Sequence, residues 1–323
     1  MIAHSGKYRK KNGQRGYVMM NNFIFENKTK VYFGKGGVKE YLGGLLANFG
    51  ETVMLAYGGG SIKCNGVYDE IMGILNAQGK CVVEFSGIMS NPTYAKVQEG
   101  AKLARENHVD LILAVGGGSV SDCCKVISGA FDTLSHAMET YFGKPDENNL
   151  SDDINEAVMR SVIRNIRILL TDPENYDARS ELAWASAMAE NGVLKIGKVT
   201  DFQAHQIEHQ LGAYTNCNHG ASLAVIHPVL YRHIYKSGTA RFTRWAQNVW
   251  GIAPKGSDEE TAAAGIDALA AFIKEIGLPA SFAELGIPAD TDFRAIADST
   301  NVTAGCCKKL THDEIYEILQ ECL

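Results

Sequence analysis

The chain has 323 residues, of which 46% are hydrophobic and 21% are charged, and its formal net charge is −6 at pH 7. This length and apolar content suffice for a sizeable core and favour two domains. The ordinary, slightly acidic charge content gives no indication of nucleic-acid binding. No apolar run reaches the about 18 residues of a membrane-spanning helix, so we expect no membrane partner.

The cysteine content indicates the redox state of the cellular compartment, and the N-terminus indicates whether the chain begins with a signal peptide. Eight cysteines include two adjacent pairs, Cys123–Cys124 and Cys306–Cys307, and no CxxC motif. This usage predicts a reduced, cytoplasmic protein without a disulfide framework or a cysteine-based zinc site. Residues 1–19 are basic and lack the apolar centre of a signal peptide, so we expect a disordered tail.

The first part of the chain alternates predicted strands with predicted helices. Four segments have strand character: VYFGK (31–35), TVMLAY (52–57), KCVVEF (80–85) and VDLILAV (109–115). A helical stretch runs to about residue 78, and residues 94–107 repeat apolar side chains at helical spacing. This alternation predicts a Rossmann-like α/β domain over residues 20–130, with a parallel sheet covered by helices.

Helical patterns dominate the rest of the chain. They cover residues 154–170, 178–193, 199–213, 240–251, 258–277 and 311–323, and polar loops separate several of them. We therefore predict an all-α domain over residues 131–323.

Two glycine runs follow predicted strands. The first comprises Gly58, Gly59, Gly60 and Ser61, and the second comprises Gly116, Gly117, Gly118, Ser119 and Asp122. Glycines at the carboxyl end of a parallel strand let the backbone approach a phosphate, and a following helix N-terminus attracts it. A tight strand-to-helix turn is the alternative for either run alone. Two such runs favour a dinucleotide-binding site.

The first run also indicates which dinucleotide binds. An NAD site usually places a carboxylate after the second strand, whereas here glycines and Ser61 follow the strand and Lys63 lies nearby. A pocket without a carboxylate accommodates a 2′-phosphate better, so we expect NADP(H) to be favoured over NAD(H).

Acidic and histidine residues form the most specific pattern in the chain. Asp132 and His136 are four residues apart, as are His205 and His209, so each pair shares a helix face; His219 follows after the turn-like TNCN. One carboxylate with neutral imidazoles suits a divalent ion such as Fe(II) or Zn(II). The alternative is a set of surface or core histidines on amphipathic helices.

The chain resembles the iron-containing (group III) alcohol dehydrogenases, in particular the branch of NAD(P)H-dependent butanol dehydrogenases and aldehyde reductases. The matching segments are FIFENKTKVYFGKG, YGGGSIKCNGVYDEI, EFSGIMSNP, ILAVGGGSVSD, FDTLSHAMETYF, DFQAHQIEHQLGAY and CNHGASLAVIHPVL. The resemblance implies that Asp132, His136, His205 and His219 hold the metal. It also implies that His209 is an active-site residue but no ligand, and that Gly116 to Asp122 hold the cofactor diphosphate.

The spacing of the motifs departs from the family. There, several tens of residues separate the GGGSxxD helix from the metal-binding aspartate, whereas here Gly118 is followed closely by Asp132. Four predicted strands, against about six in a full dinucleotide fold, also indicate an internal deletion near residue 130. The absent part would carry later strands and the loop around the nicotinamide.

The resemblance implies a homodimeric oxidoreductase that transfers hydride between NAD(P)(H) and a small primary alcohol or aldehyde, such as butanol or butanal. His209 would relay the alcohol proton, because imidazole titrates near neutral pH. Two alternatives stay open. The chain is a metal-binding remnant with weak or no activity, or it is a zinc-dependent polyol dehydrogenase of the glycerol type.

Overall fold

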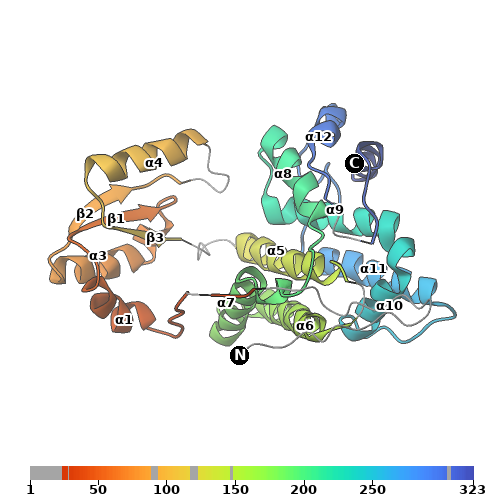
Figure 1. The fold of residues 1–323 in the computed structure, drawn as a ribbon, viewed down its shortest axis with the longest axis horizontal. Coiled ribbons are helices and arrows are strands. Elements are labelled where there is room, and N and C mark those ends of the chain that lie inside the picture. The colour runs from red at the N-terminus through yellow and green to blue at the C-terminus, as the bar shows by residue number, and fades with distance from the viewer. Residues whose placement is uncertain (1–23, 28, 89–93, 117–122, 146–147, 304–306) are drawn as a thin grey trace, which may run out of the picture. The chain divides into compact units, whose positions relative to one another are not determined.

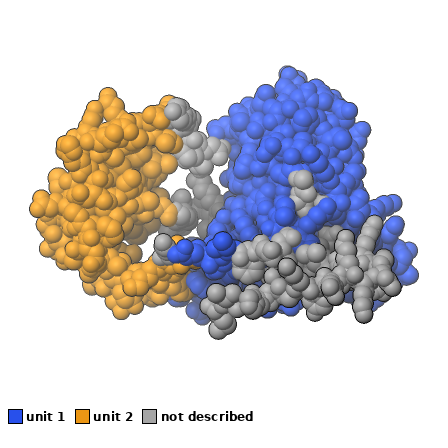
Figure 2. Space-filling model, viewed as in Figure 1, with its two compact units in different colours: residues 1–26, 127–323 blue, residues 27–126 orange. Residues whose placement is uncertain are grey.

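The computed structural model describes residues 24–27, 29–88, 94–116, 123–145, 148–303 and 307–323. Within these ranges the chain forms two compact units (Figure 2). One comprises residues 27–126, and the other comprises residues 127–323 with residues 24–26. The predicted basic tail, residues 1–19, lies outside the described residues.

The smaller unit is a three-layer α/β structure. Its elements are α1 (Gly37–Leu46), β1 (Thr52–Tyr57), α2 (Ser61–Cys64), α3 (Val67–Ala77), β2 (Cys81–Phe85), α4 (Tyr94–Glu106) and β3 (Leu111–Val115). The strands form a parallel sheet in the order β2-β1-β3, with Leu55 opposite Glu84 on one side and Leu113 on the other. Figure 1 shows α4 on one face of the sheet and α1 and α3 on the other.

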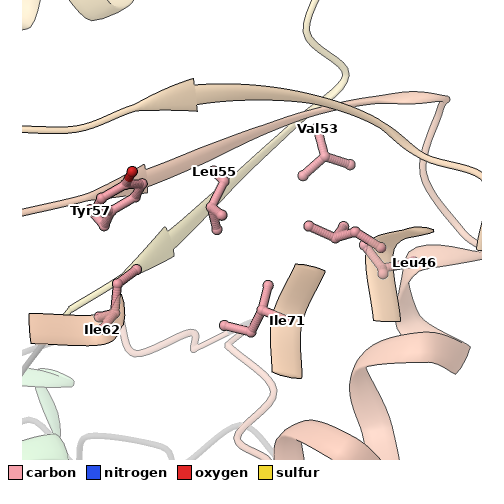
Figure 3. Close-up of a cluster of buried hydrophobic side chains, with 7 residues drawn as sticks. Leu46, Val53, Leu55, Tyr57, Ile62 and Ile71 are labelled. Carbon is pink, nitrogen blue, oxygen red and sulfur yellow. The ribbon is translucent and has the colours of Figure 1, made fainter. Parts of the chain in front are cut away.

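The central strand explains why this unit holds together. Its side chains alternate between the two faces of the sheet, and residues 53–57 are all buried. Val53 and Leu55 lie on the side of Leu46 of α1 and Ile71 of α3, and Tyr57 lies near Ile62 of α2 in the same cluster (Figure 3). On the opposite face, a smaller apolar cluster comprises Met54, Ala56 and Phe85 and extends to Leu103 and Ala104 of α4.

The larger unit is all-helical, as predicted. Its elements are α5 (Cys123–Tyr141), α6 (Leu150–Thr171), α7 (Tyr176–Glu190), η1 (Val193–Lys195), α8 (Gln203–Thr215), α9 (His219–Ile234), η2 (Tyr235–Gly238), α10 (Thr239–Asn248), α11 (Asp258–Glu275), α12 (Phe293–Ser299) and α13 (His312–Glu321). Helix α5 is a core helix, and Phe131, Leu134 and Met138 are fully buried along it. The predicted fold class is thereby confirmed.

One predicted strand is wrong. Residues 31–35 form no strand, so the described residues before α5 contain three strands rather than the predicted four. Both edges of β1 are occupied by β2 and β3, and residues 31–35 pair with neither outer strand. Val31 and Phe33 are more than half exposed. Their β propensity is therefore not supported by the burial and strand pairing that stabilise a strand.

Candidate metal and cofactor sites

Three helices of the larger unit bring the predicted ligands together. Asp132 and His136 lie one turn apart on α5, His205 lies on α8, and His219 is the first residue of α9. Asn218 caps α9 by accepting a hydrogen bond from the backbone N–H of Ala221 at 3.0 Å, which fixes where the helix begins.

Helix α9 reaches α5 through a glycine. A side-chain carbon at Gly220 would lie 2.1 Å from the backbone oxygen of Ser128 on α5. Only a glycine next to His219 allows this close approach of the two helices. The residue thereby helps to place His219 beside Asp132.

Three imidazole nitrogens surround one carboxylate oxygen. The Nε2 atoms of His205, His219 and His136 lie 3.4, 3.5 and 3.6 Å from Oδ1 of Asp132. Bonds of about 2.0–2.1 Å to a tetrahedral ion place neighbouring ligand atoms about 3.3–3.4 Å apart. Among the described residues, that buried Oδ1 has no hydrogen-bond partner. Ligand atoms of Asp132, His205 and His219 all lie within 4.8 Å of one another, and His136 is not part of that group. The spacing of these three residues suits donors arranged around a cation.

The second ring nitrogens of these histidines face carboxylates. Nδ1 of His205 contacts Oε2 of Glu139, Nδ1 of His219 contacts Oε2 of Glu208, and Nδ1 of His136 lies 2.8 Å from Oε1 of Glu190. A carboxylate accepts hydrogen bonds, so Nδ1 of His205 and of His219 carries a proton, and in the neutral ring Nε2 presents a lone pair. Nδ1 of His136 forms no hydrogen bond among the described residues. The Nε2 atoms of His136 and His205 lie 3.1 Å apart, a distance at which they can share either a proton or a cation.

The electrostatic surroundings are anionic. Although burial opposes ionisation, the imidazoles of His205 and His219 hold the pKa of Asp132 well below its usual range. Burial also opposes protonation of His205 and His219, but the neighbouring carboxylates raise their pKa values to about 9 and about 10. This field attracts a divalent cation, which would compete with protons for these nitrogens.

His209 lies beside the cluster but outside the group formed by Asp132, His205 and His219. It is exposed on α8, one turn after His205, and its ring centroid lies 6.0 Å from that of His205 and 5.7 Å from that of His219. Desolvation lowers the pKa of His209.

A second possible metal group shares one histidine with the first. Ligand atoms of Glu208, His209 and His219 also lie within 4.8 Å of one another.

The glycine runs follow neighbouring strands of the smaller unit. Tyr57 and Val115 are paired in register, so Gly58 and Gly116 leave the sheet side by side. Side-chain carbons at Gly59, Gly60 or Gly116 would meet no atom within 4 Å. Ser61 begins the short helix α2. Gly117, Gly118, Ser119 and Asp122 lie outside the described residues.

The order of the strands bears on whether NAD(H) or NADP(H) is favoured. Since residues 31–35 form no strand, β1 is the first strand that the described residues contain, and the second, β2, carries Glu84 one residue before its end. The strand that the glycines and Ser61 follow is therefore β1, and the prediction that it is the second strand is wrong. Hydrogen bonds from the hydroxyls of Tyr57 and Tyr68, of 2.5 and 2.6 Å, hold the pKa of Glu84 below its usual range.

Sequence reasoning missed the three carboxylates behind the ligands. Glu139 stands seven residues after Asp132, and Glu208 stands three residues after His205, so both share a helix face with a ligand. Their spacing was a usable signal. Glu190, at the end of α7, is far from the histidines in sequence and offers no such signal.

Comparison with known families identifies related proteins over most of the chain. The family model described as "Fe-containing alcohol dehydrogenase family, C-terminal" matches residues 126–323, and the model "Iron-containing alcohol dehydrogenase" matches residues 28–157.

No helix among the described residues is both long and apolar enough to cross a membrane.

Three relatives illustrate the similarity. A probable NADH-dependent butanol dehydrogenase 2 of Bacillus subtilis is 30% identical, with 94% of this chain and 100% of the relative covered. The NADPH-dependent aldehyde reductase YqhD of Escherichia coli is 27% identical, with 83% and 90% covered. The crystal structure of NADH-dependent butanol dehydrogenase A from Thermotoga maritima matches with a TM-score of 0.86 and 25% identity, over 95% and 100%.

The alignments also bear on the spacing of the motifs. The alignment with the Bacillus subtilis relative has 392 positions, whereas this chain has 323 residues, so at least 69 positions have no residue of this chain. This difference agrees with a segment of several tens of residues that the chain lacks.

Proposed function

The chain belongs to the iron-containing alcohol dehydrogenase family, and we propose that it transfers hydride between NAD(P)(H) and a small primary alcohol or aldehyde at a divalent metal centre. Members of the family are oxidoreductases. The observation that carries the proposal is the convergence of three imidazole Nε2 atoms on Asp132. Such a donor set is more typical of a metal-binding site than of side chains that only stabilise the fold.

In this proposal Asp132, His136, His205 and His219 hold the ion. The three imidazoles are neutral donors and the carboxylate supplies one negative charge, so a bound Fe(II) keeps a net positive charge; Zn(II) suits the same donors. When bound, such an ion supplies Lewis acidity toward the carbonyl or alkoxide oxygen of the substrate.

His209 is the proposed proton carrier. It is exposed on α8, next to the rings of His205 and His219, and desolvation lowers its pKa. A neutral imidazole there takes the hydroxyl proton from an alcohol and releases it to solvent, and it returns a proton during aldehyde reduction.

The nicotinamide cofactor is proposed to bind at the carboxyl ends of β1 and β3. Gly58, Gly59, Gly60 and Ser61 lie at the first end; Gly116, Gly117, Gly118, Ser119 and Asp122 belong to the second run. The backbone N–H groups of such turns suit phosphate oxygens.

We propose a preference for NADP(H). Lys63, in the segment after β1, pairs with Glu84 at 3.5 Å, and the hydroxyls of Tyr57 and Tyr68 also donate to that carboxylate. A carboxylate already engaged in these bonds favours a ribose 2′-OH less than a free one does. The relatives carry both preferences in their names, since the butanol dehydrogenases are NADH-dependent and YqhD is NADPH-dependent.

The proposed substrates are butanol and butanal, because the relatives named above include butanol dehydrogenases and an aldehyde reductase. The proposal includes a homodimer in the cytoplasm. The alignment gap favours the second candidate, a metal-binding chain with weak or no turnover.

Metal content tests the site. Purified wild-type protein should carry about one divalent ion per chain, measured as Fe after anaerobic preparation or as Zn otherwise. His205→Ala and His219→Ala should lower the metal content at least tenfold, because the remaining donors lose affinity and geometry. Wild-type metal content in both variants would exclude these residues as ligands.

Titration with NADPH and NADH tests the proposed cofactor preference. We expect NADPH to quench the intrinsic fluorescence at lower concentration than NADH, because Lys63 complements the 2′-phosphate. Lys63→Met should remove the difference and leave NADH binding unchanged. Tighter binding of NADH by the wild type would reject the NADP(H) preference.

A further inference from the structure

Two of the candidate histidine ligands form hydrogen bonds through Nδ1 to a carboxylate from another helix. Glu139 of α5 accepts from His205 of α8, and Glu208 of α8 accepts from His219 of α9. Oε1 of Glu190, the last residue of α7, lies 2.8 Å from Nδ1 of His136 of α5 without forming a hydrogen bond. These pairs therefore connect four helices around the site.

The two pairs at the centre are shielded from water. Glu139 and Glu208 are almost fully buried, whereas the Glu190 side chain is 50% exposed. A buried carboxylate is costly unless hydrogen bonds satisfy it. Here the donors are the imidazoles and, for Glu139, the backbone N–H groups of Ala204 and His205.

We propose that Glu139 and Glu208 are positioning residues that hold His205 and His219 in the one tautomer and orientation in which both present Nε2 to the ion. The inference rests on the proposed metal site and assigns these two residues to it. Such carboxylates fix the ring and raise the basicity of the ligand, and their loss typically weakens metal binding about 10- to 100-fold.

Both carboxylate oxygens of Glu139 accept hydrogen bonds, so an amide NH2 group cannot replace either oxygen without facing a donor. Oε1 accepts from the N–H of Ala204 at 2.6 Å, and Oε2 accepts from Nδ1 and the backbone N–H of His205. In Glu139→Gln, either orientation of the amide turns its NH2 group toward a donor. If it faces His205, it favours the tautomer with the proton on Nε2, so that this nitrogen cannot bind the ion.

The contacts of Glu208 are more adaptable. Oε1 accepts from the hydroxyl of Ser222 at 2.9 Å, and that hydroxyl also lies 2.8 Å from the backbone oxygen of Asn218. In Glu208→Gln, Ser222 can turn its proton to Asn218 and accept from the amide NH2. The amide oxygen then still faces Nδ1 of His219, so this variant should keep the tautomer. Glu208→Leu removes the acceptor altogether.

The test is the affinity for Zn(II), measured by competition with a chromophoric chelator on protein first freed of metal. Glu139→Gln and Glu208→Leu should bind about 10- to 100-fold more weakly than wild type, and Glu208→Gln should lose less than either. The matched control is Glu321→Gln, because Glu321 pairs with His233 at 3.1 Å in another His–carboxylate pair. It should bind Zn(II) like the wild type.

A second readout separates positioning from folding. Co(II)-loaded wild type should show the intense visible absorption of a tetrahedral ion, and Glu208→Leu should change this spectrum while the metal-free unfolding midpoint shows that the protein is folded. If Glu139→Gln does not fold, the Zn(II) affinities of Glu208→Leu and Glu208→Gln are compared instead, and this comparison decides whether the carboxylate positions the ligand.

The outcomes are distinguishable. A wild type that does not bind Zn(II) would reject the proposed metal site itself. Tight wild-type binding together with unchanged affinity in Glu208→Leu would leave that site intact and overturn the positioning role. Two bound ions per chain, one of them lost in Glu208→Leu and in His209→Ala, would make Glu208 a ligand and also overturn the inference.

Discussion

At the scale of single residues, chemistry at the site depends on how each histidine is surrounded. His205, His209 and His227 lie in the same helical unit, yet carboxylates raise the pKa of His205, whereas burial lowers those of His209 and His227. The spacing of the first two in the sequence predicts functional roles for them. The sequence assigns no role to His227, whose environment is set by residues far away in the chain.

His227 should make stability dependent on pH. It is fully buried, its Nε2 lies 2.6 Å from the Ser135 hydroxyl, and burial lowers its pKa to about 4 from 6.5. Between these values the unfolded chain binds more protons than the native one, so stability is full above pH 6.5 and falls toward pH 4. The loss amounts to about 3 kcal/mol at most.

Urea unfolding of metal-free protein between pH 7 and pH 4.5 measures this effect. The carboxylate of Glu139 and the imidazoles of His205 and His136 also act on His227, but they are common to wild type and His227→Gln. The wild type should lose more stability than the variant as the pH falls. Parallel loss in both would show that His227 does not titrate as stated.

At the scale of elements, the helices that carry the site are held by the segment between α7 and α8. Val199 forms an antiparallel bridge with Lys144, and Asp201 donates its N–H to the backbone oxygen of Glu139 at 3.1 Å. These bonds bring the start of α8 against the end of α5. His205 thereby lies opposite Asp132 and Glu139 although some seventy residues separate them in the sequence.

The sequence predicted most amphipathic helices and missed α9. Helices such as α6 and α11 have an apolar face, polar neighbours and side-chain caps, so their periodicity is visible. Helix α9 is buried on nearly all sides and contains Pro228, so it has no amphipathic period to detect. The approach of Gly220 to Ser128 was likewise invisible, because it depends on how two helices pack.

At the scale of the whole chain, the binding motifs are present in a sheet with few strands. The described residues contain three strands, against about six in a full dinucleotide fold. Among those residues β3 pairs only with β1, and its Ile112 is 60% exposed. A cavity of about 390 Å³ over this face is lined mainly by apolar residues, among them Met54, Phe85 and Ile112. Exposed apolar surface at an unpaired strand edge promotes association.

We therefore expect this chain to retain metal but to reduce butanal or propanal slowly. Hydride transfer needs the nicotinamide carbon about 3–3.5 Å from the reacting carbon, and a displacement of about 1 Å can cost about a hundredfold in rate. The family segment expected to hold the nicotinamide has no counterpart between the glycine run and Asp132.

A steady-state assay should compare the chain with a version in which a family-like segment of about 70 residues, the minimum length of the alignment gap, is inserted after Ala130. The longer protein should be faster by about a hundredfold or more at equal metal content, because it regains the strands that fix the cofactor. If the short chain is already as fast, the segment is dispensable, and the strands present must position the nicotinamide without it.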